Sequence, residues 1–413
     1  MDACSVLIVG GGPAGSSCAW QLRRAGIDVA ILDKATFPRN KVCGGWITLP
    51  VFDELEINAA DYARTNVLQA ITGFRTSMMG DRETETDYRK PISYGIRRSE
   101  FDDYLLKRSN ARLIEGTGLS SIARAGNEWL VNGQIKTQLI VGAGGHFCPI
   151  ARYMGSKSTT ENAVAAQETE FEMNPEQQNK CSIRPEIPEL YFCADMRGYG
   201  WCFRKGNFIN IGLGRLDKHS LGAHITAFIE FLRRTKKITF DLHSKLFGHA
   251  YLLYGRSNRK ILDDGILLIG DAAGMAYSQS GEGIRPAIES GLLAAKAITE
   301  AHGAYSSENL DRYRALLTNR FGALHDDWSV QIGRRLPPSI MNSLGRALLA
   351  TKWFSRHIVL ENWFLRSSEP AFQEPVRASL QVNAPTHRTP TVLPLSSTGI
   401  PACAPNNPRH KSP

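Results

Sequence analysis

Three glycines near the start of the chain, Gly10, Gly12 and Gly15, have a spacing that can serve chemistry. They lie in the segment GGGPAG, after an apolar run and before a stretch of helical periodicity. Glycines in this arrangement let the backbone approach a pyrophosphate group, which the positive N-terminal end of the following helix attracts. Asp33 ends the next apolar run, where a carboxylate can accept hydrogen bonds from ribose hydroxyls. The pattern predicts a dinucleotide-binding site; the alternative is a tight turn with only a structural role.

A second glycine-rich segment, GDAAGMAYSQSGEGI, follows another apolar run later in the chain. Asp271 lies where its carboxylate could accept a hydrogen bond from a ribityl hydroxyl. A helix that begins near Gly283 and Ile284 would direct its positive end toward the carbonyl end of a flavin. Because the chain carries both glycine-rich segments, we expect FAD rather than NAD as its cofactor. The alternative is a glycine-rich loop in which Asp271 only caps a helix.

The elements that must position these residues predict an α/β fold. Residues 5–9 and 28–33 are expected to be buried strands, joined by a helix over residues 13–25 in a βαβ unit. Residues 162–262 change to β-rich segments, which predict an inserted antiparallel sheet. The fold class is therefore a Rossmann-like FAD-binding domain with an inserted antiparallel β-sheet substrate domain (an α+β insert) and a C-terminal helical region.

The same changes of pattern suggest where the parts of the chain begin and end. The predicted parts are an FAD-binding domain at 1–160, a β-rich substrate domain at 161–262, a return to the FAD-binding domain at 263–305, a helical region at 306–369 and a tail at 370–413. The tail is rich in Pro, Ser and Thr, a composition that is typical of disorder.

Further motifs connect the chain to a known family. The segment FPRNKVCGG occupies residues 37–45, and IRRSEFDDYL follows at 96–105. An aromatic-x-Trp-x-Phe pattern, at residues 199–203, is followed by Gly-x-Gly at 212–214. Together with both glycine-rich segments, these motifs resemble the two-domain FAD oxidoreductases of the p-hydroxybenzoate hydroxylase fold. Within them the chain is similar to the geranylgeranyl reductase family.

The motifs and the resemblance together imply which residues contact FAD and substrate. The expected FAD contacts are Gly10, Gly12, Pro13, Ala14, Gly15, Asp33, Lys34, Lys41, Gly44, Arg98, Asp271, Gly281, Gly283 and Ile284. The expected substrate contacts are Cys43, Tyr199, Trp201, Phe203, Gly212 and Gly214. The resemblance also implies that the loop at 41–45 lies where substrate meets the isoalloxazine ring.

Cys43 is the candidate catalytic residue. It lies between Lys41 and two glycines, and a cation near a cysteine favours the reactive thiolate form. Cys43 could therefore relay a proton to substrate. The alternative is a small residue that packs under the cofactor.

The aromatic motif predicts one wall of the substrate site. Tyr199, Trp201 and Phe203 alternate along a predicted strand, so they share one face of the sheet. Such a face suits an isoprenoid chain and could stabilise cationic character on an alkene. Gly212 and Gly214 on the next strand would leave room for a ligand. The alternative is a strand of the hydrophobic core.

Composition excludes several other classes of protein. The chain has 413 residues, 42% hydrophobic and 22% charged, which is typical of a folded globular protein. Its eight cysteines form no CxxC pair and its histidines have no metal-ligand spacing, so we expect neither structural disulfides nor a metal. With no apolar run of membrane-spanning length and no signal-peptide pattern, the expected location is the cytoplasm.

The net charge of +9 comes largely from the C-terminal helical region. There, Leu, Ile, Trp and Phe alternate with Arg346, Lys352, Arg356 and Arg366. Helices of this kind attract anionic headgroups and bury an apolar face, so peripheral contact with a membrane surface is one interpretation. The other is a set of helices packed over the catalytic body. Nucleic acid is not an expected partner, because no recognisable reading module accompanies the basic residues.

The function expected from these features is that of an FAD-dependent oxidoreductase of the geranylgeranyl reductase type. It would transfer hydride from reduced flavin to a double bond of an isoprenoid or other lipophilic substrate, with NAD(P)H or a ferredoxin-type carrier as electron donor. Gly144 departs from the pattern of the related hydroxylases, which usually carry an aspartate there, although Arg152 could still serve a pyrophosphate. The main alternative is an FAD-dependent monooxygenase acting on a small lipophilic or aromatic substrate. A non-catalytic prenyl-binding carrier is a further alternative.

Overall fold

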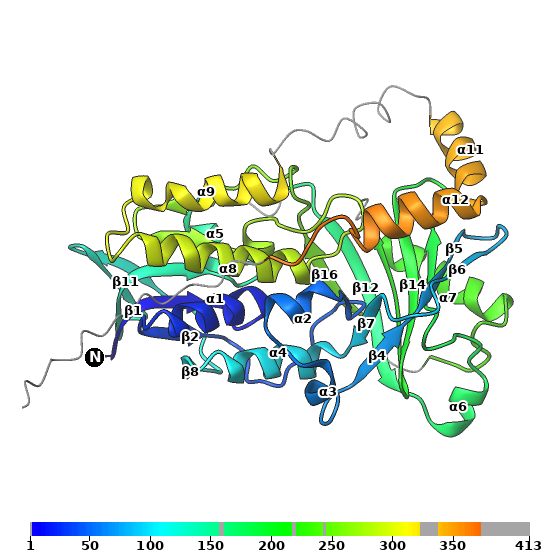
Figure 1. The fold of residues 1–413 in the computed structure, drawn as a ribbon, viewed down its shortest axis with the longest axis horizontal. Helices are drawn as coiled ribbons and strands as arrows, with labels where there is room; N and C mark the ends of the chain where they lie inside the picture. The colour runs from blue at the N-terminus through cyan, green and yellow to red at the C-terminus, as the bar shows by residue number, and fades with distance from the viewer. Residues whose placement is uncertain (1, 157–160, 217–219, 243–244, 323–337, 373–413) are drawn as a thin grey trace, which may run out of the picture. The chain divides into compact units, whose positions relative to one another are not determined.

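The computed structural model describes residues 2–156, 161–216, 220–242, 245–322 and 338–372, and within these ranges the strands form three sheets (Figure 1). The first sheet has a parallel centre. Its parallel strands, in order across the sheet, are β18 (Ile266–Leu268), β11 (Ile135–Gly142), β1 (Asp2–Val9), β2 (Val29–Leu32) and β8 (Arg112–Ile114). Three strands add to it antiparallel: β17 (Leu262–Asp263), β10 (Glu128–Val131) and β9 (Ile122–Ala125).

The helices of this part pack around α1 (Pro13–Arg24), which follows β1 directly. Pro13 occupies the first helical turn, where its missing N–H costs no hydrogen bond. α1 packs against α8 (Ile284–Glu300) and α4 (Arg98–Arg108), and α9 (Ser307–Phe321) packs on α8. Gly291 permits the close approach of α1 and α8, because a Cβ there would lie 2.4 Å from the carbonyl oxygen of Ala14. The predicted βαβ unit and the Rossmann-like fold class are confirmed.

The second sheet has seven strands. In order they are β16 (Phe247–Tyr251), β12 (Val164–Glu172), β15 (Phe208–Arg215), β14 (Gly198–Lys205), β13 (Glu189–Phe192), β5 (Gly73–Met78) and β6 (Thr84–Asp87). All neighbouring pairs are antiparallel except β13 with β5. The sequence predicts that this sheet comes from residues 161–262 alone. The structure differs, because β5 and β6 lie within the segment assigned to the FAD-binding domain.

A small third sheet is built from strands that lie between β2 and β8 in the sequence. It consists of β3 (Trp46–Thr48), β7 (Ser93–Ile96) and β4 (Leu68–Ile71), with the short helices α2 (Pro50–Glu54) and α3 (Ala59–Tyr62) between β3 and β4. The remaining short helices of the body are α5 (Pro149–Tyr153), α6 (Pro175–Asn179) and the 3₁₀ turn η1 (Gly270–Ala272).

The seven-stranded sheet has two differently used faces. One face packs on α7 (Leu221–Arg234), and Gly200 on β14 accommodates this contact because a Cβ there would lie 2.6 Å from the Phe228 ring. On the other face, Trp201 and Phe203 join an aromatic core cluster with Trp46. The period-two alternation of β14 thus separates a packing face from a face that is free to line a cavity.

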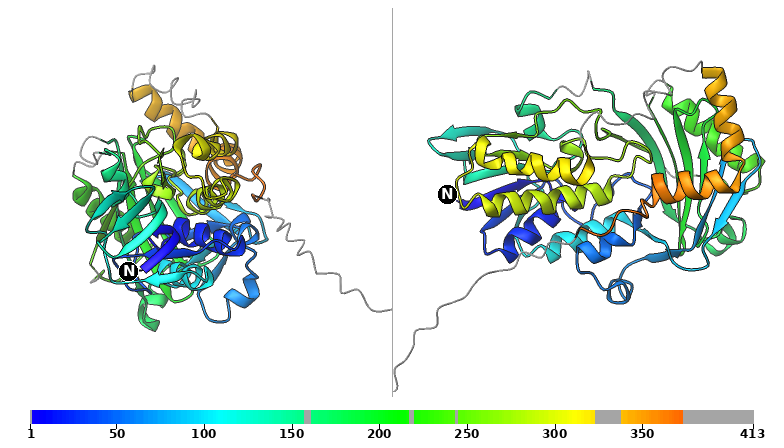
Figure 2. Two further views of the ribbon diagram at one scale, coloured as in Figure 1. Left: turned by 90° about the vertical axis from the view of Figure 1, so that its left-hand side faces the viewer. Right: turned by 45° about the horizontal axis from the view of Figure 1, so that its top comes forward.

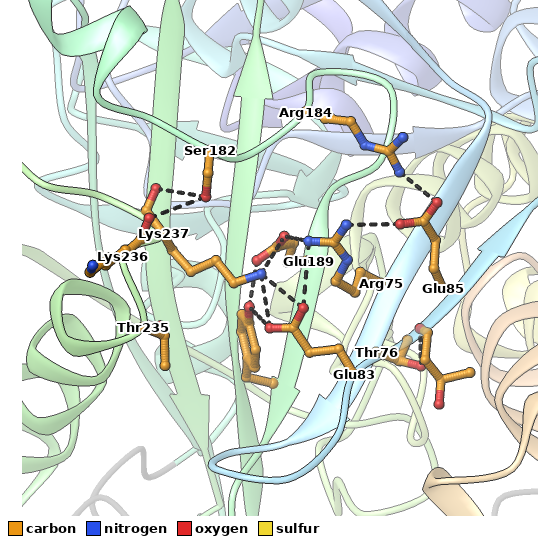
Figure 3. A network of polar contacts seen from close by, with 12 residues as sticks. Arg75, Thr76, Glu83, Glu85, Ser182, Arg184, Glu189, Thr235, Lys236 and Lys237 are labelled. Carbon is orange, nitrogen blue, oxygen red and sulfur yellow. Dashed lines mark hydrogen bonds and ion pairs between the residues drawn. The ribbon is translucent and has the colours of Figure 1, made fainter.

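A charged network attaches the β5–β6 hairpin to the α7 side of the sheet (Figure 3). Glu189 on β13, only 1% exposed, accepts from Arg75 at 2.7 Å and from Lys237 at 3.0 Å. Lys237 also donates to Glu83 in the hairpin turn at 2.9 Å, and the Tyr191 hydroxyl donates to the same carboxylate at 3.0 Å. Removing one partner of such a buried pair is costly because it leaves a charge unpaired. The network therefore holds in place a hairpin that is distant in sequence from β13, the strand with which it pairs.

The C-terminal helices lie beside the seven-stranded sheet (Figure 2). They are α11 (Pro338–Leu349), α12 (Lys352–Phe354) and the π-helix η2 (Ser355–Phe364), which contact β5 and β6. The helical region predicted at 306–369 is therefore divided between two locations. α11, α12 and η2 lie beside the second sheet, whereas α9 packs on α8 and β17. Of the predicted tail, residues 373–413 lie outside the described residues.

After η2, the chain is held against α8 by a buried cluster of charged residues. Arg285, fully buried, donates to Glu54 at 3.1 Å and to Glu289 at 2.8 Å. Arg285 and Arg320 also donate to the carbonyl oxygen of Pro370, at 2.8 and 3.0 Å. These bonds fix the segment that follows η2. No helix among the described residues combines the length and apolarity needed to cross a bilayer.

Candidate functional site

A cavity of about 560 Å³ connects the glycine turn after β1 with the aromatic face of β14. Most of the residues expected to bind FAD or substrate lie along its wall. These are Gly10, Gly12, Pro13, Ala14, Asp33, Lys34, Lys41, Cys43, Gly44, Arg98, Tyr199, Trp201, Phe203, Asp271, Gly281, Gly283 and Ile284. Gly15, Gly212 and Gly214 do not line it, and their contacts are described below.

The first glycine turn is shaped by close backbone contacts. Gly10 has a φ of +118°, and a Cβ there would lie 2.4 Å from the carbonyl oxygen of Ala143, which directly follows the neighbouring strand β11. A Cβ at Gly15 would lie 1.9 Å from the carbonyl oxygen of Gly10. Gly12 is different, because its Cβ would meet only the Arg39 guanidinium, at 3.4 Å. Gly10 and Gly15 therefore build the turn, whereas Gly12 leaves its cavity side open.

This end of the cavity fits the diphosphate and ribose of a dinucleotide. The N-cap of α1 is Gly12, which offers no side chain to the first N–H groups of the helix, so these groups are available to an anion. Asp33 accepts from the backbone N–H of Gly11 at 2.7 Å and from that of Ala35 at 2.8 Å. These bonds fix the Asp33 carboxylate at the end of β2, beside the cavity.

The second glycine segment lines the middle of the cavity. Asp271 lies in η1, and its Oδ1 atom would be 3.4 Å from a Cβ at Gly283, so it lies at the N-terminus of α8. The N-cap of α8 is Gly283, which has no side chain to cap the helix. The neighbouring Glu282 accepts from the backbone N–H of Arg285 at 2.7 Å, and burial raises the pKa of Glu282 to about 7. The first turn of α8, at Gly283 and Ile284, thus lines this part of the cavity with Glu282 beside it.

Lys41 and Asp271 are connected through His249 on β16. The Lys41 Nζ atom lies 3.0 Å from Nδ1 and 2.8 Å from Nε2 of His249, and Nε2 lies 3.3 Å from Oδ2 of Asp271. Burial lowers the pKa of Lys41 to about 8, although Asp271 opposes this effect. Burial would raise the pKa of Asp271, but the hydrogen bond from His249 and the nearby cations lower it.

The backbone of Cys43 is held by the seven-stranded sheet. Its N–H donates to Glu168 on β12 at 2.7 Å, and its carbonyl oxygen accepts from Asn210 on β15 at 3.1 Å. Asn210 also accepts from the indole N–H of Trp201 at 2.7 Å. These bonds place the thiol of Cys43, which is partly exposed, on the cavity wall beside the aromatic face.

Arg98 reaches the cavity from the N-terminal turn of α4. It makes a bidentate pair with Asp102, with both N–O distances at 2.8 Å. Burial alone would lower the pKa of Arg98, but Asp102 and the Cys43 thiol overcome this effect and raise it. Arg98 is therefore a permanent cation next to Cys43.

The aromatic wall is present as the alternation predicts, and it is larger than the motif. Tyr199, Trp201 and Phe203 line the cavity, and further apolar walls come from other segments. These are Trp46 on β3, Leu190 on β13, Tyr251 on β16 and Phe364 on η2. The cavity is thus most apolar where β14 and these four residues line it.

Gly212 and Gly214, which were expected to leave room for a ligand, do not line the cavity. A Cβ at Gly212 would lie 2.2 Å from the Trp201 indole, so the space above this glycine is filled by that ring. Gly214 lies 3.6 Å from the same indole by the same measure. Both glycines therefore pack against Trp201 and lie outside the cavity wall.

Several residues of the site were not found from the sequence. They are Glu168, Asn210, His249 and Tyr251, which come from three strands of the second sheet. Each is a single polar or aromatic residue without a motif around it. Their only signal is the strand alternation that puts them on the cavity face, and this requires the strand register to be known.

The loop after β11 closes the cavity near the first glycine turn. Gly144, Gly145, His146 and Arg152 line it there. A Cβ at Gly144 would lie 3.2 Å from the Cα of Cys148, so a larger residue would need this loop to shift. The absence of an acidic side chain at 144 thus agrees with how tightly the loop is folded.

Comparison with known proteins gives consistent relatives. The family model described as an FAD binding domain matches residues 3–324. A menaquinone reductase of Mycobacterium tuberculosis is 29% identical over 347 residues, covering 78% of this chain and 81% of the relative. A digeranylgeranylglycerophospholipid reductase of Methanocaldococcus jannaschii is 28% identical over 330 residues, covering 76% and 81%.

A solved structure shares the fold. It is a geranylgeranyl bacteriochlorophyll reductase-like protein from Thermoplasma acidophilum, with a TM-score of 0.73, 20% identity, and coverage of 89% of this chain and 97% of that one. The family match spans most of the described chain, both glycine turns and α8 included. The chain therefore belongs to the family defined by this FAD binding domain and is an FAD-dependent oxidoreductase.

Proposed function

We propose that this enzyme reduces a carbon–carbon double bond of an isoprenoid-bearing lipid. The observation that carries the proposal is the aromatic end of the cavity, which is continuous with the flavin end and meets it at Cys43. Two relatives are named as reductases of menaquinone and of digeranylgeranylglycerophospholipid, both of which carry isoprenoid chains. An apolar, π-rich channel beside the cofactor is suited to such a chain.

The residues divide the work of the reaction among them. When bound and reduced, FAD supplies a hydride to one carbon of the double bond. The wall of Tyr199, Trp201 and Phe203 holds the double bond in line and excludes water, and Cys43 supplies the proton to the other carbon. The hydride, which carries two electrons, and the proton from Cys43 together make up the two hydrogens that are added. The thiol regains its proton from solvent, and NAD(P)H or a ferredoxin-type carrier restores the electrons.

The C-terminal helices support a peripheral contact with a membrane surface. Leu344 on α11 and Trp353 on α12 are 47% and 65% exposed, and Lys352 is exposed beside Trp353. Exposed aromatic and basic residues on neighbouring helices are typical of interfacial docking. Phe364 of the following η2 lines the cavity, so a lipid entering beneath these helices would pass directly to the aromatic wall.

An anaerobic single-turnover experiment tests the proposed reaction. The FAD-loaded enzyme is reduced with dithionite and mixed with a geranylgeranyl lipid or with menaquinone, and flavin reoxidation is followed by absorbance. We expect reoxidation together with a product heavier by one or more hydrogen pairs, measured by mass spectrometry. A product that forms only after oxygen is admitted, and that contains oxygen, would identify a monooxygenase instead.

The lowered pKa of Lys41 predicts a pH dependence of FAD affinity. Below pH 8 the ammonium is charged and attracts the anionic cofactor; above pH 8 the free protein loses this charge. Linkage then predicts that the Kd for FAD rises about tenfold between pH 7 and pH 9. Titration of apoprotein by flavin fluorescence measures this change.

Two variants control the Lys41 measurement. Lys41→Arg keeps the charge over this range, so its FAD affinity should change little between pH 7 and pH 9. Lys41→Met should bind more weakly at pH 7 and be equally insensitive to pH. A native-like pH profile in Lys41→Met would assign the titration to another group.

A further inference from the structure

His249 joins two parts of the cavity wall that come from distant segments of the chain. It lies on β16, the edge strand of the seven-stranded sheet, whereas Lys41 precedes the Cys43 loop and Asp271 belongs to the turn after β18. One imidazole contacts both side chains, at 2.8 to 3.0 Å and at 3.3 Å. The ring also stacks on Tyr251, with centroids 6.2 Å apart and an interplanar angle of 27°, so its plane is fixed.

The surroundings of His249 determine which of its nitrogens carries the proton. Burial lowers the pKa of His249, Lys41 and Arg98 lower it further, and only Asp271 raises it, so the imidazole is neutral at pH 7. A neutral ring has one N–H donor and one acceptor. In the Nε2–H form, Nε2 donates to Asp271 and Nδ1, 3.0 Å from Lys41 Nζ, accepts from the ammonium, which also lies 2.8 Å from Nε2 beside the edge of the ring. In the Nδ1–H form, the lone pair of Nε2 would face a lone pair of the Asp271 carboxylate.

This arrangement divides the two oxygens of Asp271 between different tasks. Oδ2 is engaged by His249, while Oδ1 lies beside Gly283 at the N-terminus of α8, within the cavity wall. A carboxylate held by one oxygen presents the other in a defined direction, as orienting partners do for metal-binding side chains. The same imidazole also holds Lys41, so both ends of the contact line the cavity.

We propose that His249 is a positioning residue of the FAD site, which fixes the Asp271 carboxylate and the Lys41 ammonium relative to one another. This role goes beyond the family motifs, which include Lys41 and Asp271 but not His249. It rests on FAD binding alone and does not depend on which lipid is the substrate.

Three substitutions separate positioning from packing. His249→Phe keeps the ring against Tyr251 but removes donor and acceptor. His249→Gln keeps one donor and one acceptor on a similar spacing, and His249→Asn is too short to reach both partners. The readout is the Kd of purified apoprotein for FAD, from fluorescence titration without lipid. We expect the Kd to rise about tenfold in His249→Phe and His249→Asn and to stay near native in His249→Gln.

A double-mutant comparison tests whether His249 acts through Asp271. In an Asp271→Asn background, His249→Phe should weaken FAD binding far less than it does in the native chain. His357→Phe is the matched control, because His357 pairs with Glu361 at 2.7 Å on the exposed side of η2 and should leave the Kd unchanged.

Each outcome decides the proposal. Restoration by His249→Gln together with loss of the His249→Phe effect in the Asp271→Asn background supports positioning. Equal losses in all three His249 variants would show that only the packed ring matters and would overturn it. So would native affinity in His249→Phe, or the same tenfold loss with Asp271→Asn present. If His249→Phe does not fold, His249→Asn provides the same comparison. Because no lipid is present, a wrong substrate assignment would leave these results unaffected.

Discussion

Gly15→Ala should abolish retention of FAD and destabilise the protein, whereas Gly12→Ala should fold normally and lose only FAD affinity. The two positions differ in what an added methyl group would meet. At Gly15 it would lie 1.9 Å from the backbone carbonyl of Gly10, which cannot yield without moving the whole turn. Overpacking of this kind costs about 3 kcal/mol at the upper end of its usual range.

At Gly12 the backbone is extended, with φ of −74°, and the nearest atom to an added Cβ is a flexible Arg39 nitrogen at 3.4 Å. Alanine should therefore leave the thermal stability of the apoprotein unchanged. The methyl group would still face the cavity where the diphosphate must approach the start of α1, so we expect FAD affinity to fall at least about tenfold.

Thermal unfolding of apoprotein and FAD titration separate these two effects. Gly26→Ala is a useful comparison, because Gly26 lies just beyond the other end of α1 and has open space around its Cβ position. Because Gly26 has a φ of +79°, alanine there should lower stability modestly and leave FAD affinity unchanged. Full FAD binding by Gly12→Ala would show that the cofactor does not approach this turn closely, and would contradict the assignment of the diphosphate end.

The parts of the fold that sequence reasoning found are those with local signals. The strand–turn–helix around Gly10 combines a short apolar run, glycines at fixed spacing and a helical period, all within 24 residues of the chain. The alternation of Tyr199, Trp201 and Phe203 correctly placed three rings on one face, because the side-chain period of a strand is local.

The parts that were missed depend on pairing between distant segments. β5 joins β13 in parallel, and nothing in the sequence of residues 73–78 specifies a partner at 189–192. Glu168 and Asn210 look like the polar positions of half-exposed strands. They become the supports of Cys43 only because the register of β12 with β15 sets Glu168 opposite Gly212, two residues beyond Asn210 on β15. The same reasoning explains Gly212: its role is set by Trp201 on the neighbouring strand, at the position directly opposite it.

The chemistry proposed for Cys43 leads to the other large effect. Cys43→Ala should bind FAD with near-native affinity, because the short bonds that hold this loop come from the Cys43 backbone, whereas its thiol only accepts from the Gly45 N–H at 3.4 Å. Turnover of the double bond should fall about 10²- to 10⁴-fold, the usual range for loss of a positioned proton donor. Hydride cannot be retained on an isolated alkene unless the second carbon is protonated as it arrives, so the loss should appear in the chemical step.

Rapid anaerobic mixing of reduced enzyme with lipid isolates that step. Cys4→Ala is the matched control: Cys4 is buried in β1 and does not line the cavity, so its removal should leave flavin reoxidation by substrate unchanged. Cys43→Ser should recover part of the rate, because a hydroxyl can donate from nearly the same place between Arg98 and the aromatic wall. If Cys43→Ala reoxidised at the native rate, the proton would have to come from another wall residue. Tyr251 would then be the first to replace, because it lines the cavity where its ring packs on His249 and its hydroxyl oxygen would lie 2.5 Å from a Cβ at Gly281.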